Sequence, residues 1–513
     1  MKKISTIHIA LIISLLGMIA CDKNFVKTNT DPVSLTSIDP IYLFSNAQRL
    51  AVHRTVDYQA AIVQQIITPQ PGSLAGGNYN QATDIQTTLA FDSLYPGPVK
   101  YLTDVLNQTK GNAARSNLYN MARILKAYIF ELLVDIYGDV PYSQAGQAYL
   151  GGLYLPKYDN ASDIYDDILK ELTQATAALD ATKQIETQEL FYAGNIAQWK
   201  KLGNSLLLRT AMRLTKVDPA KAQANAAVAL NPANGGLIET IADNTRFLTS
   251  SVFDNVFVER FHAAERGNYY MAAPFVDYLK STNDPRLSQI AVKYQFPANA
   301  LGATGTEDTT IAHQNGMPLG YNASTLATAP GFPGAIGGGY AYSQPNRRTI
   351  SALTSPAFLV SASQTLLLEA EAAQRGWTTG NAATLYAAGV KADMDQFTQY
   401  TGTTTIAIPA AIQAAYLAAN PFNPATALQQ INTQYWISSY INWDEAWANF
   451  RRSGFPVLTP NPYPQADPDV KGGFIHRLSY PDRELSVNTA NVNAAIAQQG
   501  PDILSTRVFW DKP

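Results

Sequence analysis

The feature of this sequence that most constrains its fold is a helical spacing of apolar residues that recurs along the chain. Between residues 118 and 136, apolar side chains alternate at intervals of four and three residues, so they share one face of a helix. They are Leu118, Ala122, Leu125, Ile129, Leu132 and Ile136. Ser162 is a candidate N-cap of a second helix, whose apolar face carries Ile164, Ile168, Leu172, Ala175 and Leu179. Because such faces must be buried against one another, the pattern predicts a mainly α fold.

Further helices are expected over about 198–214, 220–230, 363–376 and 382–400. Near the C-terminus an aromatic stripe has the same four-three spacing, and we expect it to lie on one helix and to pack in the core. It consists of Trp436, Tyr440, Trp443, Trp447 and Phe450. Successive helices of this length suggest helix pairs like those of TPR proteins, although the regular TPR sequence signature is absent.

Three long stretches between the helices lack any periodicity and are rich in Gly, Pro, Asn and Thr. They cover residues 68–84, 297–348 and 454–483. Stretches of this length inside a compact protein are usually functional or disordered. The sequence therefore predicts a rigid helical frame that carries long recognition loops.

The N-terminus has the pattern of an export signal. Lys2 and Lys3 precede an almost unbroken apolar run from Ile7 to Ala20, which is shorter than the roughly 20 residues that a transmembrane helix needs. Cys21 follows at once, is the only cysteine of the chain, and looks like the cysteine of a bacterial lipobox. An ordinary signal peptide and an uncleaved anchor are the alternatives. We expect the chain to divide into a lipoprotein signal peptide at residues 1–20, a tether lipidated at Cys21 over residues 21–40, and a binding domain at residues 41–513.

Composition and motifs argue against several classes of function. The formal net charge of −3 does not suit nucleic acid, which is bound by clustered Lys and Arg. No sequence motif for zinc, a nucleotide phosphate or a serine nucleophile occurs, so no metal, cofactor or catalytic residue is expected. The carboxylate pairs Glu369/Glu371 and Asp393/Asp395 come nearest to the acid–base pair of a glycosidase, but residues two apart on a helix point to different faces.

Six blocks of sequence stand out in order along the chain. They are CDKNFVKTNTDP at 21–32, DIYGDVPYSQAGQ at 135–147, WKKLGNSLLLRTAMRL at 199–214, LLLEAEAAQRGW at 366–377, YINWDEAWANFRRSGFPVL at 440–458 and FIHRLSYPDRELSVN at 474–488. Together they resemble the SusD/RagB-like outer-membrane nutrient-binding lipoproteins of Bacteroidota. The resemblance is to the SusD-like subgroup that reads YGDVPY and EAW-x-x-x-RR-x-G-x-P, and it covers nearly the whole mature chain.

This resemblance implies both a fold and a function. The fold is a scaffold of TPR-like helical pairs with long irregular loops that form the ligand face. The function is that of a cell-surface lipoprotein, anchored in the outer membrane by lipid, that captures oligosaccharides and passes them to a SusC-like TonB-dependent transporter. The resemblance implies neither an enzyme nor a cofactor. A peptide-binding RagB-like member is the alternative, followed by a surface glycoside hydrolase.

Loop aromatics with polar neighbours are the candidate ligand-binding residues. A sugar presents C–H patches that suit aromatic faces, and hydroxyl groups that suit amides and guanidinium groups. The candidates are Asn78, Tyr79, Asn80, Tyr321, Asn322, Phe332, Tyr340, Tyr342 and Arg347. For each of them, local packing within its loop is the alternative to ligand contact.

Overall fold

The computed structural model describes residues 38–53, 58–70, 78–250, 252–299, 307–400 and 407–513. Within it, Pro40–Pro513 form one compact unit. The expected signal peptide, Cys21 and the tether up to residue 37 lie outside the described residues. None of the helices in the described ranges is both long enough and apolar enough to cross a membrane.

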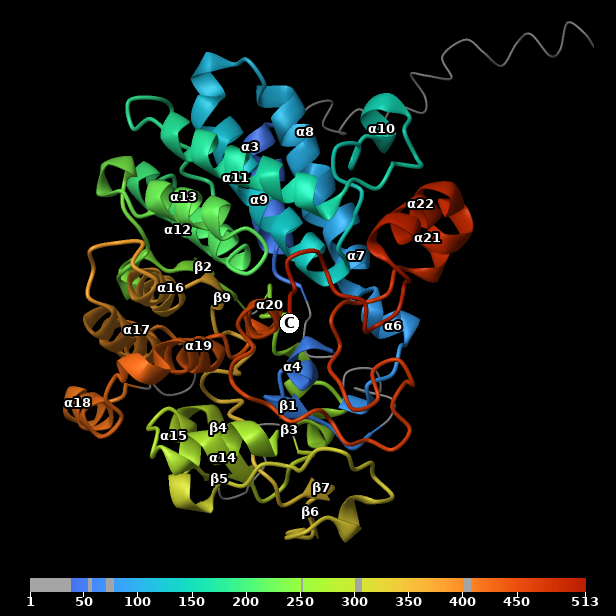
Figure 1. Cartoon of the computed structure of the whole chain (residues 1–513), viewed down its shortest axis with the longest axis vertical. Helices are drawn as coiled ribbons and strands as arrows, with labels where there is room; N and C mark the ends of the chain where they lie inside the picture. Colours follow the sequence, from blue (N-terminus) through green and yellow to red (C-terminus); the bar gives the residue numbers. More distant parts are fainter. Residues whose placement is uncertain (1–37, 54–57, 71–77, 251, 300–306, 401–406) are drawn as a thin grey trace, which may run out of the picture. The chain divides into compact units, whose positions relative to one another are not determined.

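Paired helices make up the scaffold, which confirms the predicted mainly α fold (Figure 1). Helix α3 packs on α8, α9 on α11, α12 on α13, α16 on α17 and α19 on α20. Their bounds are α3 Pro40–Leu50, α8 Lys100–Thr109, α9 Ser116–Tyr137, α11 Ala161–Ala178, α12 Ile196–Arg213, α13 Pro219–Ala229, α16 Ala362–Gln374, α17 Ala382–Gln396, α19 Ala427–Ser438 and α20 Trp443–Ser453. The apolar faces predicted on α9 and α11 are buried along their whole length, because each packs against the other.

Two details of the helix prediction were wrong. Asn160, rather than Ser162, caps α11, and its Oδ1 accepts a hydrogen bond of 2.9 Å from the backbone N–H of Ser162. The aromatic stripe is divided between α19 and α20 by the turn at residues 439–442, where Ile441 has a φ of +79°. The spacing continues through the turn, so the sequence pattern does not reveal the break.

Gly138, which belongs to the YGDVPY block, ends α9. Its φ of +79° is one that L side chains rarely adopt. A Cβ atom at this position would also meet the Gln499 side chain at 2.1 Å. The backbone conformation therefore favours glycine at this helix end, and the side-chain amide of Gln499 would have to shift to admit a larger residue.

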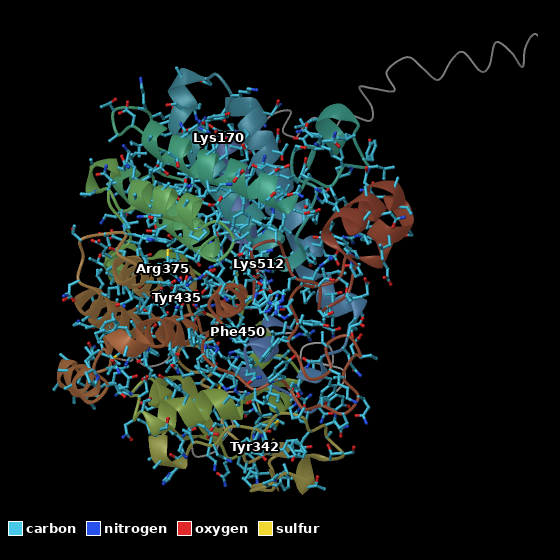
Figure 2. The ribbon with its side chains drawn as sticks, viewed as in Figure 1. Lys170, Tyr342, Arg375, Tyr435, Phe450 and Lys512 are labelled. Carbon is cyan, nitrogen blue, oxygen red and sulfur yellow. The ribbon has the colours of Figure 1, made fainter. Side chains whose placement is uncertain are left out.

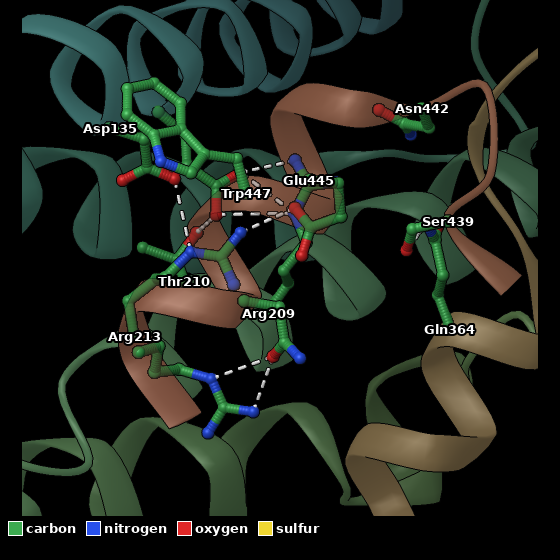
Figure 3. Close-up of polar contacts among 12 residues, drawn as sticks. Asp135, Arg209, Thr210, Arg213, Gln364, Ser439, Asn442, Glu445 and Trp447 are labelled. Atoms are coloured by element: carbon green, nitrogen blue, oxygen red, sulfur yellow. Dashed lines mark hydrogen bonds and ion pairs between the residues drawn. The ribbon is translucent and has the colours of Figure 1, made fainter. Parts of the chain in front are cut away.

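Buried charges join α9, α12 and α20 in the centre of the scaffold (Figure 3). Arg209 Nε lies 3.1 Å from Glu131 Oε2, and Arg213 Nε lies 3.2 Å from Asp135 Oδ2. Glu445 also pairs with Arg213. Burial opposes the charge on Glu445, but the two guanidinium groups outweigh that effect and lower its pKa. These charges compensate one another inside the core and fix the three helices relative to each other.

Short antiparallel strands organise the loops. Strand β1 pairs with β3, β2 with β9, β4 with both β5 and β8, and β6 with β7. Their bounds are β1 Ile66–Ile67, β2 Thr245–Phe247, β3 Tyr270–Met271, β4 Ala291–Tyr294, β5 Glu307–Asp308, β6 Ala335–Ile336, β7 Gly339–Tyr340, β8 Gln344–Pro345 and β9 Ala357–Val360. The shorter helices are α4 Gln59–Ile62, α6 Asp84–Thr87, α7 Leu89–Leu94, α10 Ala148–Gly151, α14 Ala273–Ser281, α15 Leu287–Ile290, α18 Ala410–Ala419, α21 Asp482–Val487 and α22 Thr489–Gln499.

Candidate functional site

A second apolar cluster, separate from the scaffold core, lies where β1, β3 and β7 meet the long loops, and we call it the loop cluster. Its buried members are Ile67, Tyr270, Ala272, Met317, Leu326, Ala329 and Tyr342. Partly buried side chains pack around them, and these are Leu319, Tyr321, Phe332 and Tyr340. Figure 2 labels Tyr342 in this region, whereas Tyr435 and Phe450 lie on scaffold helices. The structure therefore brings together the four aromatic candidates from the 297–348 stretch.

The aromatic rings of the loop cluster pack against one another with their planes inclined. The centroid of the Phe332 ring lies 6.0 Å from that of Tyr340, with the planes at 65°. The Tyr270 and Tyr342 rings are T-shaped at 6.3 Å. The hydroxyl of Tyr270 accepts a hydrogen bond of 2.9 Å from the backbone N–H of Tyr340, which fixes the β6–β7 hairpin over the cluster. Such contacts hold the Tyr340 ring in place before any ligand arrives.

A cavity of about 430 Å³ opens beside this hairpin. Its lining combines one aromatic ring, two amide side chains and a glycine-rich backbone segment. The lining residues are Gln70, Gly267, Asn268, Ala335, Ile336, Gly337, Gly338, Gly339 and Tyr340. The volume falls in the range of about 300–1,000 Å³ that is usual for small-ligand sites. Of the candidate residues, Tyr340 is the one that lines this cavity directly.

Tyr79 and its neighbours contact the 454–483 stretch. The Tyr79 ring stacks on Tyr463 with centroids 4.2 Å apart and planes at 14°. Burial, followed by the nearby Tyr463 and Tyr340 hydroxyls, raises the pKa of Tyr79. Asn78 and Asn80 are buried, and the backbone carbonyl of Asn80 accepts a hydrogen bond of 2.8 Å from the N–H of Asp467. These three residues join the 68–84 stretch to the 454–483 stretch.

Asn322 stabilises the turn that follows it. Its Oδ1 accepts hydrogen bonds from the backbone N–H groups of Ser324 and Thr325, at 3.0 and 3.1 Å. Its amide donates to the hydroxyl of Tyr463 at 3.4 Å. The side chain thus holds the turn close to the loop cluster.

Arg347 is buried and acts as an internal clamp. Its guanidinium lies 4.2 Å from the ring centroid of Tyr294 and donates to the carbonyl of Pro297 at 3.2 Å. The segment held in this way meets the β6–β7 hairpin, because the N–H of Ala298 donates to the carbonyl of Gly337 at 3.4 Å. Arg347 therefore supports one wall of the cavity from behind.

Sequence reasoning missed four residues of the site: Tyr463, Tyr270, Gln70 and Asn268. Tyr463 and Gln70 lie in stretches that lack periodicity, and Tyr463 has the same kind of asparagine neighbour, Asn461, that marked Tyr79. Tyr270 and Asn268 precede the stretch at 297–348 by about thirty residues, and no sequence signal connects them with it. Tertiary contacts bring them to the site: β1 pairs with β3, and the backbone N–H of Tyr340 donates to the hydroxyl of Tyr270.

The carboxylates that come nearest to an acid–base pair lie on the scaffold helices α16 and α17. Burial opposes the charge on Glu371, but Arg452 and Arg375 outweigh it and lower its pKa to about 2. Burial raises the pKa of Glu369 to about 8, and the nearby carboxyl of Glu239 adds to this effect. Asp393 pairs with Arg286, whose Nη1 lies 2.7 Å from its Oδ2. Within the described ranges, no group of three or more His, Cys, Asp or Glu side chains could hold a metal ion.

Comparisons with known proteins agree on one family. The SusD-like family model, described as starch-binding and associating with the outer membrane, matches residues 32–481. A solved chitin-binding protein is 29% identical, with a TM-score of 0.79 over 93% of this chain and 100% of its own. No curated protein matches the sequence.

Two further solved structures are similar to the chain. A SusD-like protein from Bacteroidetes AC2a is 25% identical, with a TM-score of 0.81 over 93% of this chain and 100% of its own. A chitin-binding SusD homologue from Flavobacterium johnsoniae is 23% identical, with a TM-score of 0.74 over 92% of this chain and 98% of its own. These similarities confirm the fold that the sequence blocks predict.

Proposed function

We propose that this chain, which belongs to the SusD-like family of starch-binding proteins that associate with the outer membrane, captures oligosaccharides at the loop cluster. The observation that carries the proposal is the cavity of about 430 Å³ that Tyr340 lines together with Gln70 and Asn268. An aromatic ring offers a flat face to the C–H patches of a sugar, and the amides offer both donors and acceptors to its hydroxyl groups. The proposed mechanism is binding alone.

Chitin fragments are the first ligands to test, because the protein of known structure that is 29% identical is named as chitin-binding. Gln70 and Asn268 line the same cavity as Tyr340. Their side-chain amides can form hydrogen bonds with the amides of the N-acetyl groups of chitin. Calorimetric titration of the full chain in detergent, with chitin oligosaccharides, malto-oligosaccharides and short peptides, tests the ligand class. Binding of either oligosaccharide supports the proposal. Binding of peptides alone contradicts it and favours a RagB-like function, and release of shorter sugars from a bound oligosaccharide favours a hydrolase.

Delivery to a SusC-like TonB-dependent transporter completes the proposed function. A binding protein with a family link to the outer membrane has to pass its ligand to a channel, because the outer membrane excludes oligosaccharides. Copurification of a large barrel protein with this chain from detergent extracts supports the partnership. Isolation of the chain alone under the same conditions contradicts it.

Lipid attachment at Cys21 gives the proposal a separate test. A variant Cys21→Ser cannot be acylated, so it loses acyl chains that each contribute about 0.8 kcal/mol per buried methylene. We expect the variant to move from the membrane fraction to the soluble fraction, as measured by ultracentrifugation and immunoblot. A variant that stays with the membranes contradicts lipid anchoring and leaves ligand capture untouched.

A further inference from the structure

A smaller cavity of about 250 Å³ lies on the scaffold, between α8, α9 and the segment 143–150, which extends into α10. We call it the Lys126 pocket, and it shares no lining residue with the cavity at the loop cluster. Most of its lining is polar. Its polar side chains include those of Asn107, Lys110, Tyr119, Lys126 and Gln147.

Lys126 is held over two aromatic rings at the wall of this pocket. Its Nζ lies 4.8 Å from the ring centroid of Tyr142 and 5.6 Å from that of Phe130. In the part of the chain that the structure describes, this ammonium forms neither an ion pair nor a hydrogen bond. Burial lowers the pKa of Lys126. A partly buried lysine without a partner is costly, and an anion in the pocket would remove that cost.

The carboxylates around Lys126 do not neutralise it. Three of them lie close enough to act on its charge, and each already has a nearer cation. The pairs are Asp159 with Lys157, Asp167 with Lys170, and Glu171 with Arg123. Lys110 adds a second ammonium to the same lining, and no acidic side chain lines the pocket. The pocket therefore carries an excess of positive charge.

Neutral hydrogen-bonding groups complete the lining. The amides of Asn107 and Gln147 and the hydroxyl of Tyr119 face the pocket. Among the described residues, these three groups have no hydrogen-bonding partner. Two ammonium groups suit a carboxylate, whereas two amides and a phenol suit hydroxyl groups. The lining thus matches a ligand that carries both.

We propose that the Lys126 pocket binds the carboxylate-bearing sugar residue of an acidic glycan, as a second site on the scaffold. The choice of a sugar rests on the proposed function, whereas the choice of an anion rests on Lys126 and Lys110 alone. The pocket is smaller than the cavity beside Tyr340, at about 250 against about 430 Å³, which suits one terminal or branching residue. An acidic glycan could then contact the protein at two separate places.

The test is a calorimetric titration of the full chain in detergent with glucuronate, glucose and inorganic phosphate. We expect glucuronate to bind about ten-fold more tightly than glucose, because only glucuronate carries a carboxylate that can pair with the lysine ammonium groups. Lys126→Met keeps the aliphatic stem over the rings and should weaken glucuronate binding by about ten-fold. Lys126→Arg should retain most of the binding. Lys100→Met is the matched control, because Lys100 lies 5.5 Å from the ring centroid of Tyr101 but does not line the pocket.

Three results would overturn the proposal: equal affinity for glucuronate and glucose, unchanged glucuronate binding in Lys126→Met, and binding of phosphate without glucuronate. Thermal unfolding of each variant, measured alongside, tests whether its fold is intact. Failure here is distinguishable from failure of the proposed function, because neutral chitin oligosaccharides and Tyr340→Ala report on the loop cluster. A chain that binds glucuronate at Lys126 but no neutral oligosaccharide keeps this inference and contradicts the other.

Discussion

The scaffold core and the loop cluster both bury polar groups, but they satisfy them in different ways. In the scaffold, Arg213 and Glu445 lie on separate helices and compensate each other's charge with no exposed surface. In and beside the loop cluster, two buried tyrosine hydroxyls donate to nearby backbone carbonyls. The hydroxyl of Tyr270 donates to Gly267, and that of Tyr79 donates to Pro69.

This difference separates stability from binding. A buried ion pair between helices becomes an uncompensated charge when one partner is removed, so the whole helical frame depends on it. A hydroxyl that bonds to a carbonyl within its own loop fixes a ring locally, and its loss leaves the frame in place. We therefore expect scaffold substitutions to lower the free energy of unfolding, and loop-cluster substitutions to lower ligand affinity.

The most damaging way to test the scaffold is to remove one partner of a buried charge pair. Glu371 accepts hydrogen bonds of 2.8 and 2.7 Å from Arg452. Glu371→Gln leaves this guanidinium buried without a carboxylate, so we expect the free energy of unfolding to fall by about 3–5 kcal/mol in urea denaturation. Lys391→Gln is the control, because the exposed Lys391–Asp395 pair contributes only about 0–1 kcal/mol. Equal losses in the two variants would contradict this role of the Glu371–Arg452 pair.

A second scaffold carboxyl, that of Glu369, should make the free energy of unfolding fall as the pH rises. Glu369 keeps its proton in the folded state up to about pH 8, whereas its ordinary pKa is 4.5. The unfolded chain therefore loses this proton first as the pH rises. We expect the free energy of unfolding to fall by about 2–4 kcal/mol between pH 4.5 and pH 8 because of this group.

The comparison of wild type with Glu369→Gln in urea at several pH values isolates that effect. In Glu369→Gln the free energy of unfolding should fall much less as the pH rises, because a neutral amide does not ionise. In Glu239→Gln the pH-dependent fall should be reduced by a smaller amount, because Glu369 remains buried. Parallel pH profiles for wild type and Glu369→Gln contradict the assignment.

In the loop region the smallest effect on stability is expected. Tyr79→Phe removes the hydroxyl that donates to Pro69 and keeps the ring stacked on Tyr463. We expect a loss of about 1 kcal/mol in the free energy of unfolding, as for a single neutral hydrogen bond. Tyr154→Phe, at a side chain that is 76% exposed, should have almost no effect. A loss as large as that of Glu371→Gln would show that the loop cluster and the scaffold are not energetically separate.

The scaffold was the more predictable of the two regions. The four-three spacing of apolar residues identified α9 and α11, because the face that each helix presents to the other repeats with the helical period. The turn at Ile441 was missed because α19 and α20 continue one spacing across it, and only the φ of +79° reveals the break. The spacing of apolar residues predicts which face of a helix is buried, but it does not predict where one helix ends and the next begins.

The loop cluster was predictable as a region and not as an arrangement. Tyr340 and Phe332 were identified from loop composition, and the structure places them together. The stacking of Tyr79 on Tyr463 joins residues far apart in sequence, and the clamp role of Arg347 depends on the carbonyl of Pro297. Such contacts follow from tertiary pairing, which no periodicity within a loop encodes.

The most direct test of the account is a calorimetric titration of a chitin oligosaccharide into wild type, Tyr340→Ala and Tyr154→Ala, with the unfolding midpoint of each protein measured alongside. We expect Tyr340→Ala to weaken binding by about ten-fold or more, because one stacking face of the cavity is lost. Tyr154→Ala should bind like wild type, and all three proteins should unfold at similar midpoints. Unchanged affinity in Tyr340→Ala would contradict the central claim that the loop cluster is the ligand site.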